Sequence, residues 1–169
     1  VNGKYTTRGW TEWTQGFQFG SSLLQFDATG DEKFMNLGRD HTLKKMSPYL
    51  THTGVHDHGF NNLSTFGNLF RLMKERKISG NERELEIYRM SVKVSGAVQA
   101  GRWTKTREGG FIFSFNGPQS LFVDTIRSCR ILMMAHLMGH FLQGEGDLHI
   151  SLFDRAVDHI LATAKYSVY

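Results

Sequence analysis

Hydrophobic side chains recur along this chain at the three- and four-residue spacing of amphipathic helices. A first segment of this kind runs through Phe26, and a second runs from Glu32 to Met46. Thr29-Gly30-Asp31 separates them, and a glycine between short polar residues is typical of a turn. Pro48 cannot continue the second helix. The pattern therefore predicts two helices joined by a tight turn at Gly30.

The same pattern occurs twice more. Apolar residues around Phe66 and Met73 precede a turn at 79–81 and a helix that begins with polar residues. The apolar stretch 121–142 precedes a turn at 144–147 and a helix from about His149 to Lys165. In each pair the first helix is the more apolar one. This arrangement predicts an all-α fold, an array of helical hairpins with the apolar helices inside and the mixed helices outside.

Polar loops rich in glycine connect the hairpins, at residues 1–16, 47–62 and 101–120. Within the last loop Phe111, Phe113 and Phe115 alternate with other residues, which predicts a short strand or β-turn. None of the loops looks like a domain linker, so we expect a single domain over 1–169. Three hairpins would leave apolar edges exposed, and a helix lies just before the last residues. We therefore expect the chain to be part of a larger protein.

Composition and charge exclude several classes of protein. Of the 169 residues 40% are hydrophobic and 21% charged, which is typical of one globular domain. The net charge is +4, but lysine and arginine are scattered over the predicted helices, which argues against a nucleic-acid interface. The most apolar stretch carries Asp124, Arg127 and Arg130 and is too polar to span a membrane. Cys129 is the one cysteine, so no intrachain disulfide can form, and its apolar context favours a core position.

The residues with chemical potential lie in the loops before the three apolar helices. Aromatic rings can stack on sugar faces, and amides or carboxylates can bind sugar hydroxyls, so this combination indicates a carbohydrate cleft. The alternative is that the aromatic rings fill the core. The candidates in these loops include Trp13, Gln15, Phe17, His56, Asp57, Asn61, Asn62, Phe115, Asn116, Gln119 and Asp124.

Asp57 and Asp124 are the candidates for acid–base chemistry. Asp124 lies in the apolar context Leu121-Phe122-Val123-Asp124-Thr125-Ile126. A carboxylate there costs free energy unless it is paired or functional. A structural alternative is a residue at a helix N-terminus that interacts with the helix dipole.

The histidines raise the question of a metal site. His52, His56 and His58 lie close together in sequence, and His136 and His140 are spaced for one helix face. Positions 137–139 are Leu-Met-Gly, however, so the glutamate of a zinc-hydrolase motif is absent. We therefore expect no metal, and we interpret His136 and His140 as packed helix residues.

Four segments, in order, resemble landmarks of the unsaturated glucuronyl hydrolases, glycoside hydrolase family 88. They are "TQGFQFGSSLLQFDATGDEKF", "HDHGF", "FIFSFN" followed by "VDTIRSC", and "AVDHILATAKY". The unsaturated rhamnogalacturonyl hydrolases of family 105 share much of this layout. The resemblance implies an (α/α)6 toroid of six hairpins, of which this chain would cover about half.

These families hydrate the vinyl ether of the Δ4,5-unsaturated uronic acid that polysaccharide lyases leave on oligosaccharides. By resemblance, Asp124 would be the acid/base and Asp57 would lie beside it. His56 and His159 would contact the substrate, and Gln18 and Phe115 occupy positions where the family has tryptophan. Trp13 and Asn116 complete the candidate binding residues. The resemblance implies no cofactor, an oligosaccharide partner with a uronic acid end, and a bacterial cytoplasmic or periplasmic protein.

Three other functions remain open from the residues. One is a uronidase or another glycosidase that uses the two carboxylates on a saturated sugar. Another is a non-catalytic helical array that binds carbohydrate or protein. The last is a metal protein built on the histidines. The sequence leaves the oligomeric state undetermined.

Overall fold

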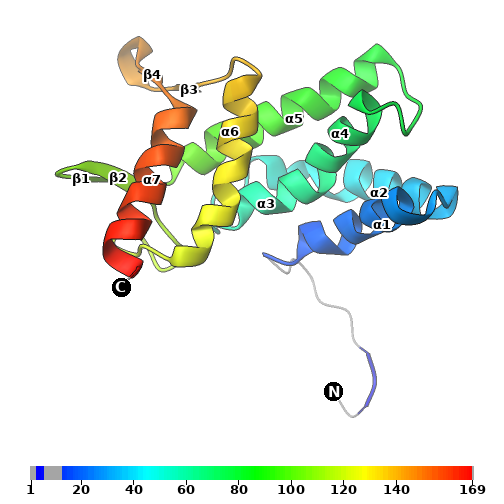
Figure 1. Cartoon of the computed structure of the whole chain (residues 1–169), viewed down its shortest axis with the longest axis horizontal. Coiled ribbons are helices and arrows are strands. Elements are labelled where there is room, and N and C mark those ends of the chain that lie inside the picture. The colour runs from blue at the N-terminus through cyan, green and yellow to red at the C-terminus, as the bar shows by residue number, and fades with distance from the viewer. Residues whose placement is uncertain (1–2, 6–12, 169) are drawn as a thin grey trace.

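The computed structural model describes residues 3–5 and 13–168. The chain is mostly helical, as Figure 1 shows. Its helices are α1 (Gln15–Thr29), α2 (Glu32–Lys45), α3 (His58–Asn62), α4 (Asn68–Lys74), α5 (Glu82–Gly101), α6 (Cys129–Leu137) and α7 (Leu152–Ser167). Shorter helical turns are η1 (Ser47–Leu50), η2 (Leu63–Gly67), η3 (Val123–Ser128) and η4 (Glu145–Asp147). Among the described residues, no helix is both long enough and apolar enough to cross a membrane.

The first two predicted hairpins are confirmed. Gly30 ends α1 in the left-handed conformation (φ 73°), and the Asp31 side chain caps α2 by accepting a hydrogen bond from the Lys33 N–H. The first helix of the second hairpin is continuous from α3 through the π-helical turn η2 into α4. The second helix, α5, is capped by Asn81.

The third hairpin differs from the prediction. Helix α6 ends at Leu137, and Gly139 follows in the left-handed conformation (φ 73°), so His140 lies outside the helix. Helix α7 begins at Leu152 and not at about His149, because Ser151 caps it by accepting a hydrogen bond from the Asp154 N–H. The interpretation of His136 and His140 as neighbours on one helix face is therefore wrong.

The all-α prediction is correct only in part, because two small antiparallel sheets interrupt the helices. Strands β1 (Trp103–Thr106) and β2 (Gly109–Ile112) form a hairpin in which Trp103 is opposite Ile112. This hairpin includes the start of the predicted aromatic strand. Strands β3 (Leu142–Gln143) and β4 (His149–Ile150) close the connection between α6 and α7. A toroid is not seen in the described part of the chain.

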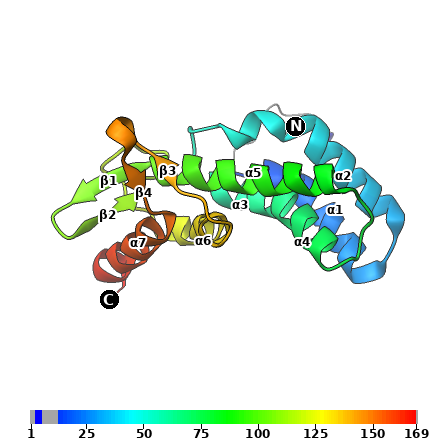
Figure 2. The ribbon, with the colours of Figure 1, turned by 90° about the horizontal axis from the view of Figure 1, so that it is seen from above.

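Two apolar clusters share α5. One cluster joins α1, α2 and α4 and includes the buried Tyr88 of α5. The other joins α6, α7 and β2 and includes Val92 and Ala100 of the same helix. Figure 2 shows how the length of α5 connects the two groups of elements. The predicted division into inner apolar and outer mixed helices does not describe α5, because it contributes to both cores.

Glycines allow the helices that lead to the candidate site to approach closely. A Cβ at Gly16 of α1 would lie 2.4 Å from the Asn61 backbone, and one at Gly20 would lie 2.6 Å from the Ser64 carbonyl oxygen. The Gly16 N–H also donates to Asn61 Oδ1 at 2.6 Å. The start of α1 is thereby held against α3 and η2.

Candidate active site

Side chains from the starts of three helical segments, and from the loop before the third, line one pocket. The pocket has a volume of about 280 Å³ and is lined by Trp13, His56, Asp57, Phe115, Phe122, Asp124 and Arg127. Trp13 precedes α1, Asp57 precedes α3, and Asp124 lies in η3. Larger hollows exist elsewhere, but the described cluster of His and Asp side chains that could share a ligand lies here.

One arginine joins the two aspartates. Arg127 Nη2 donates a hydrogen bond to Asp57 Oδ1 at 3.0 Å and another to Asp124 Oδ2 at 2.8 Å. Asp57 is 4% exposed, and such burial of a carboxylate requires a partner charge. Arg127 provides that charge from the solvent side, where its own side chain is 42% exposed.

His56 completes the polar cluster. Its Nε2 lies 2.9 Å from Asp124 Oδ1 and 3.7 Å from Asp57 Oδ2. When Asp124 is ionised it can only accept this hydrogen bond, and the ring hydrogen is then on Nε2. The other ring nitrogen, Nδ1, is buried and has no partner among the described residues. Both oxygens of Asp124 are therefore engaged, one by His56 and the other by Arg127.

Aromatic rings form the rest of the wall. The Phe115 ring stacks on the His56 ring with centroids 5.7 Å apart, and the Phe122 ring meets it edge-on at 5.5 Å. Trp13, Phe115 and Phe122 are all exposed on their outer side. These rings offer flat apolar surface beside charged groups, which is the composition expected of a site for a polar ligand with apolar faces.

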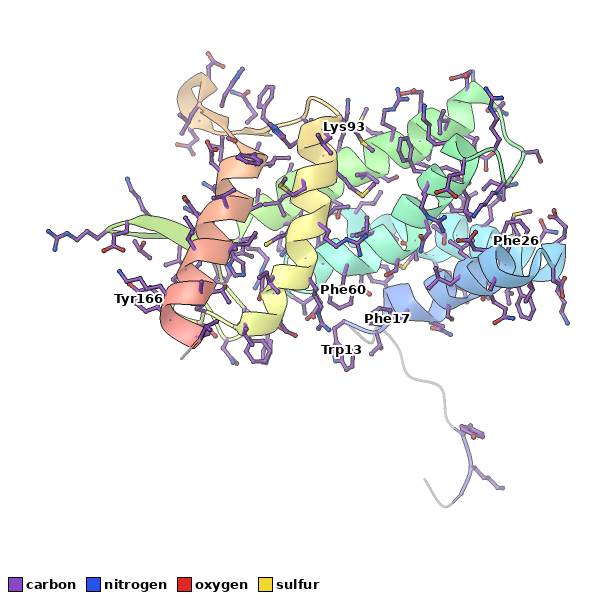
Figure 3. All side chains as sticks on the ribbon, in the orientation of Figure 1. Trp13, Phe17, Phe26, Phe60, Lys93 and Tyr166 are labelled. Carbon is purple, nitrogen blue, oxygen red and sulfur yellow. The ribbon has the colours of Figure 1, made fainter. Side chains whose placement is uncertain are left out.

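A second group of aromatic rings packs against the guanidinium of Arg127. Phe60 of α3 stacks with Phe17 of α1, with centroids 5.0 Å apart. Arg127 Cζ lies 4.2 Å from the centre of the Phe60 ring, within the range of a cation–π interaction. Figure 3 shows Trp13, Phe17 and Phe60 gathered near the starts of α1 and α3.

Two buried polar residues outside the pocket hold its loops. Gln99 of α5 donates from Nε2 to the His56 carbonyl at 2.9 Å and accepts from the Gly59 N–H at 3.0 Å. Arg102 donates to the carbonyl oxygens of Thr53 and Ser114, and to that of Phe113. Because Arg102 joins the two loops, it fixes the segment that carries Phe115 next to the segment that carries His56. Burial lowers the pKa of Arg102.

His58 faces away from the pocket. Its Nε2 lies 2.9 Å from Ser95 Oγ of α5, and both residues are buried. Burial lowers the pKa of His58 to about 4. The imidazole is therefore neutral at pH 7 and links α3 to α5.

The structure brings together five of the site residues expected from sequence. Asp57, Asp124, His56, Trp13 and Phe115 all line the pocket. His159, Gln18 and Asn116 were also expected as binding residues, and none of these three lines the pocket.

These three residues have other surroundings. His159 of α7 is fully buried, and its Nδ1 accepts the Ile112 N–H at 3.2 Å. Burial lowers the pKa of His159 to about 4. Gln18 is exposed on α1 and accepts a hydrogen bond from Gln15, and Asn116 is exposed in the turn after β2, where its carbonyl accepts from Gln119.

Two pocket residues were missed in the sequence. Arg127 was considered only as a charge that makes the apolar stretch too polar to span a membrane, and Phe122 as part of an apolar run. The interval between Asp124 and Arg127 could have identified the arginine, because residues three apart on a helical turn lie on the same side. Arg127 follows Asp124 by that interval, which would have placed the cation beside the carboxylate.

The residues that could bind a metal ion in the structure differ from the histidine cluster that the sequence suggested. The three loop histidines do not converge, and the group that could hold an ion is His56, Asp57 and Asp124, with ligand atoms within 4.8 Å of one another. A cation would have to displace Arg127, which already donates to both carboxylates. Cys129 is buried as predicted, and burial raises the pKa of its thiol to about 12, so it is no nucleophile.

The arrangement can place a carboxylate acid–base group against a ligand held between aromatic rings. Two carboxylates, one imidazole and one guanidinium share a pocket with a capacity for a single sugar-sized group. A scan against protein-family models finds no match to this chain, and searches of curated proteins and of solved structures also find none.

Proposed function

We propose that the chain belongs to a carbohydrate-active hydrolase that hydrates the vinyl ether of unsaturated uronyl oligosaccharides. The observation that carries this proposal is the pairing of Asp57 with Asp124 beneath exposed aromatic rings. The pairing supports the roles implied by the resemblance to glycoside hydrolase family 88.

The proposed reaction needs one acid–base group and one water molecule. Asp124 would deliver its proton to C4 of the sugar while a water molecule adds its hydroxyl to C5, and the remaining proton of that water returns to the Asp124 carboxylate. The resulting hemiketal opens to a ketone at C5 and a hemiacetal at C1, and the hemiacetal then releases the adjoining sugar as an alcohol. Asp57 would position Arg127 at the pocket, and Trp13 and Phe115 would stack on the sugar ring.

We extend the proposal to the (α/α)6 toroid. In such a toroid the inner helices begin at the same end and surround the cleft. Here α1, the helix that begins with α3, and the segment that begins with η3 all start at the candidate pocket. The shared starting point of these three segments supports the proposed toroid, although they would form only part of its ring.

A second candidate is a glycosidase that acts on a saturated uronide. One observation favours it: the two carboxylates accept hydrogen bonds from the same nitrogen, so they lie close together. Retaining glycosidases place their carboxyl groups about 5–5.5 Å apart. The two candidates differ in substrate, because one requires the C4=C5 double bond and the other does not.

The test follows the ultraviolet absorbance of the conjugated double bond in lyase-generated disaccharides from glycosaminoglycans, pectin and ulvan. We expect the absorbance to decrease with the intact protein and to persist with Asp124→Asn. Asp40→Asn is the matched control, because Asp40 is exposed on α2 and does not line the pocket. Unchanged absorbance with every fragment would refute hydration, and release of a chromogenic alcohol from a saturated uronide would favour the second candidate.

A further inference from the structure

Arg127 is the one permanently charged cation that lines the pocket, as far as the chain is described. We propose that Arg127 binds the carboxylate of an acidic sugar and, by turning toward it, releases Asp124 for reaction. The claim that Arg127 binds the carboxylate concerns binding alone. The claim that Asp124 is thereby released for reaction rests on the proposed function.

The charge of the pocket requires such a residue. Asp57 and Asp124 both face it, so an anionic ligand approaches two carboxylates. His56 is the remaining ionisable group, and its Nε2 is already directed at Asp124. Of the described side chains in the pocket, only Arg127 has a permanent charge that can offset this repulsion.

Arg127 has donors to spare. A guanidinium carries five N–H groups, and only Nη2 of Arg127 makes hydrogen bonds to described residues. The donors on Nε and Nη1 belong to a side chain that is 42% exposed. A parallel two-bond contact with a carboxylate uses Nη2 together with Nε or Nη1. The ligand therefore takes over one N–H of Nη2 from Asp124, while the other N–H of Nη2 can keep the contact with Asp57.

Phe60 orients the guanidinium for this role. The ring lies under Arg127 Cζ at 4.2 Å and is itself almost fully buried, 6% exposed. A guanidinium stacked on a ring presents its N–H edge sideways, away from the ring. Arg127 also lines the adjoining hollow of about 490 Å³ together with Phe17 and Phe60, so a ligand can reach it from either side.

The release of Asp124 follows from its two contacts. Its Oδ1 is engaged by His56 and its Oδ2 by Arg127, so neither oxygen is free to reach a substrate atom in the present arrangement. A ligand carboxylate that takes over the Arg127 donor frees Oδ2 while His56 still holds Oδ1. The acidic ligand would thereby expose the carboxylate oxygen that acts on it.

The binding test uses isothermal titration with D-glucuronate, with neutral D-glucose as the reference ligand and a chelator present. We expect the intact protein to prefer glucuronate, and Arg127→Met to lose about tenfold or more of that affinity, as befits the loss of a charged hydrogen-bond pair. Arg107→Met is the matched control, since Arg107 is exposed between β1 and β2 and lines neither the pocket nor the adjoining hollow. Far-ultraviolet circular dichroism and thermal unfolding verify that each variant folds. Equal glucuronate affinity in Arg127→Met and the intact protein, or no preference over glucose, overturns the inference.

The kinetic test separates the inference from the proposed function. With an unsaturated disaccharide, Arg127→Met should raise KM by about tenfold and change kcat much less, because Asp124 is then free from the start. If Arg127 had only a structural role, its loss would raise KM and lower kcat together. If no fragment is hydrated but glucuronate binding still depends on Arg127, the proposed function fails and the carboxylate site stands. If hydration persists in Arg127→Met with unchanged KM, the carboxylate site fails and the proposed function stands.

Discussion

Gly59 of α3 and Ser128 of η3 are in such close contact that a Cβ on residue 59 would lie 2.6 Å from the Ser128 carbonyl oxygen. Asp57 immediately precedes α3, and Asp124 lies in η3, the turn that ends at Ser128. The contact therefore sets the separation of the two carboxylates that Arg127 joins.

Gly59→Ala is expected to push α3 away from η3. The added methyl group meets backbone atoms that cannot rotate away, so the free energy of unfolding should fall by about 1–3 kcal/mol. The Asp57–Arg127–Asp124 contacts should loosen, and any activity should fall further than stability alone explains. Urea unfolding and turnover measured on the same sample check both effects.

Gly101→Ala is the matched control for this substitution. Gly101 ends α5, and a Cβ there would meet no atom within 4 Å. It should leave stability unchanged or raise it by a few tenths of a kcal/mol to about 1 kcal/mol, because alanine restricts the unfolded chain. Equal losses in the two variants would show that the Gly59–Ser128 contact does not set the separation.

Gln99→Leu tests the support of the loop from outside the pocket. The substitution removes the donor to the His56 carbonyl and the acceptor of the Gly59 N–H, both of which are buried. Each unpaired buried group costs about 1–3 kcal/mol, so the free energy of unfolding should fall measurably. Gln25→Leu is the matched control, because Gln25 is exposed on α1, and it should leave stability nearly unchanged. Equal losses in the two variants would contradict the supporting role of Gln99.

The two buried histidines outside the pocket predict how stability depends on pH. Burial lowers the pKa of both His58 and His159 from 6.5 to about 4 in the folded protein. Between these values the unfolded chain binds protons that the folded chain does not, so stability falls as the pH falls from 6.5 toward 4. Below about 4 both states are protonated and the loss stops. Integrated over this window, each histidine contributes a loss on the order of 3 kcal/mol.

The measurement is urea unfolding between pH 5 and 7, above the range in which carboxylates titrate. His159→Gln should make the dependence of stability on pH shallower by one histidine's share. The same substitution at His136, which is exposed on α6, is the reference. A pH dependence as steep in His159→Gln as in the intact protein would contradict a neutral buried His159.

The sequence predicts those parts of the fold that depend on local pattern. The helices around Gly30 and Asn81 are found where expected, because turn and capping residues act on their immediate neighbours. The end of α6 was missed because apolar residues continue through Leu142 although Gly139 breaks the helix. Hydrophobic pattern alone does not distinguish a helix from the short strand that follows it.

For the site, the two aspartates were predictable and their arrangement was not. Asp124 stood out because a carboxylate in an apolar run needs a partner. The identity of that partner depended on tertiary contacts, since Asp57 and His56 come from a distant segment and Gln99 holds them from a third. His159 was expected in the cleft from resemblance to a family. Its nitrogen instead accepts a backbone hydrogen bond from β2, a contact that a sequence motif does not encode.

The last prediction concerns metal ions and the role of Arg127 as a counter-ion. His56, Asp57 and Asp124 could offer one ligand atom each, and Arg127 now occupies the carboxylates. We expect the intact protein to hold no stoichiometric Zn²⁺ after dialysis, and we expect chelator to leave its unfolding temperature unchanged. Arg127→Met removes the competing charge and should let the cluster bind Zn²⁺, which raises the unfolding temperature through preferential binding to the folded state. Arg127→Met combined with His56→Gln should lose that binding. Stoichiometric Zn²⁺ in the intact protein, measured by elemental analysis, would mean that the guanidinium does not exclude metal from this cluster.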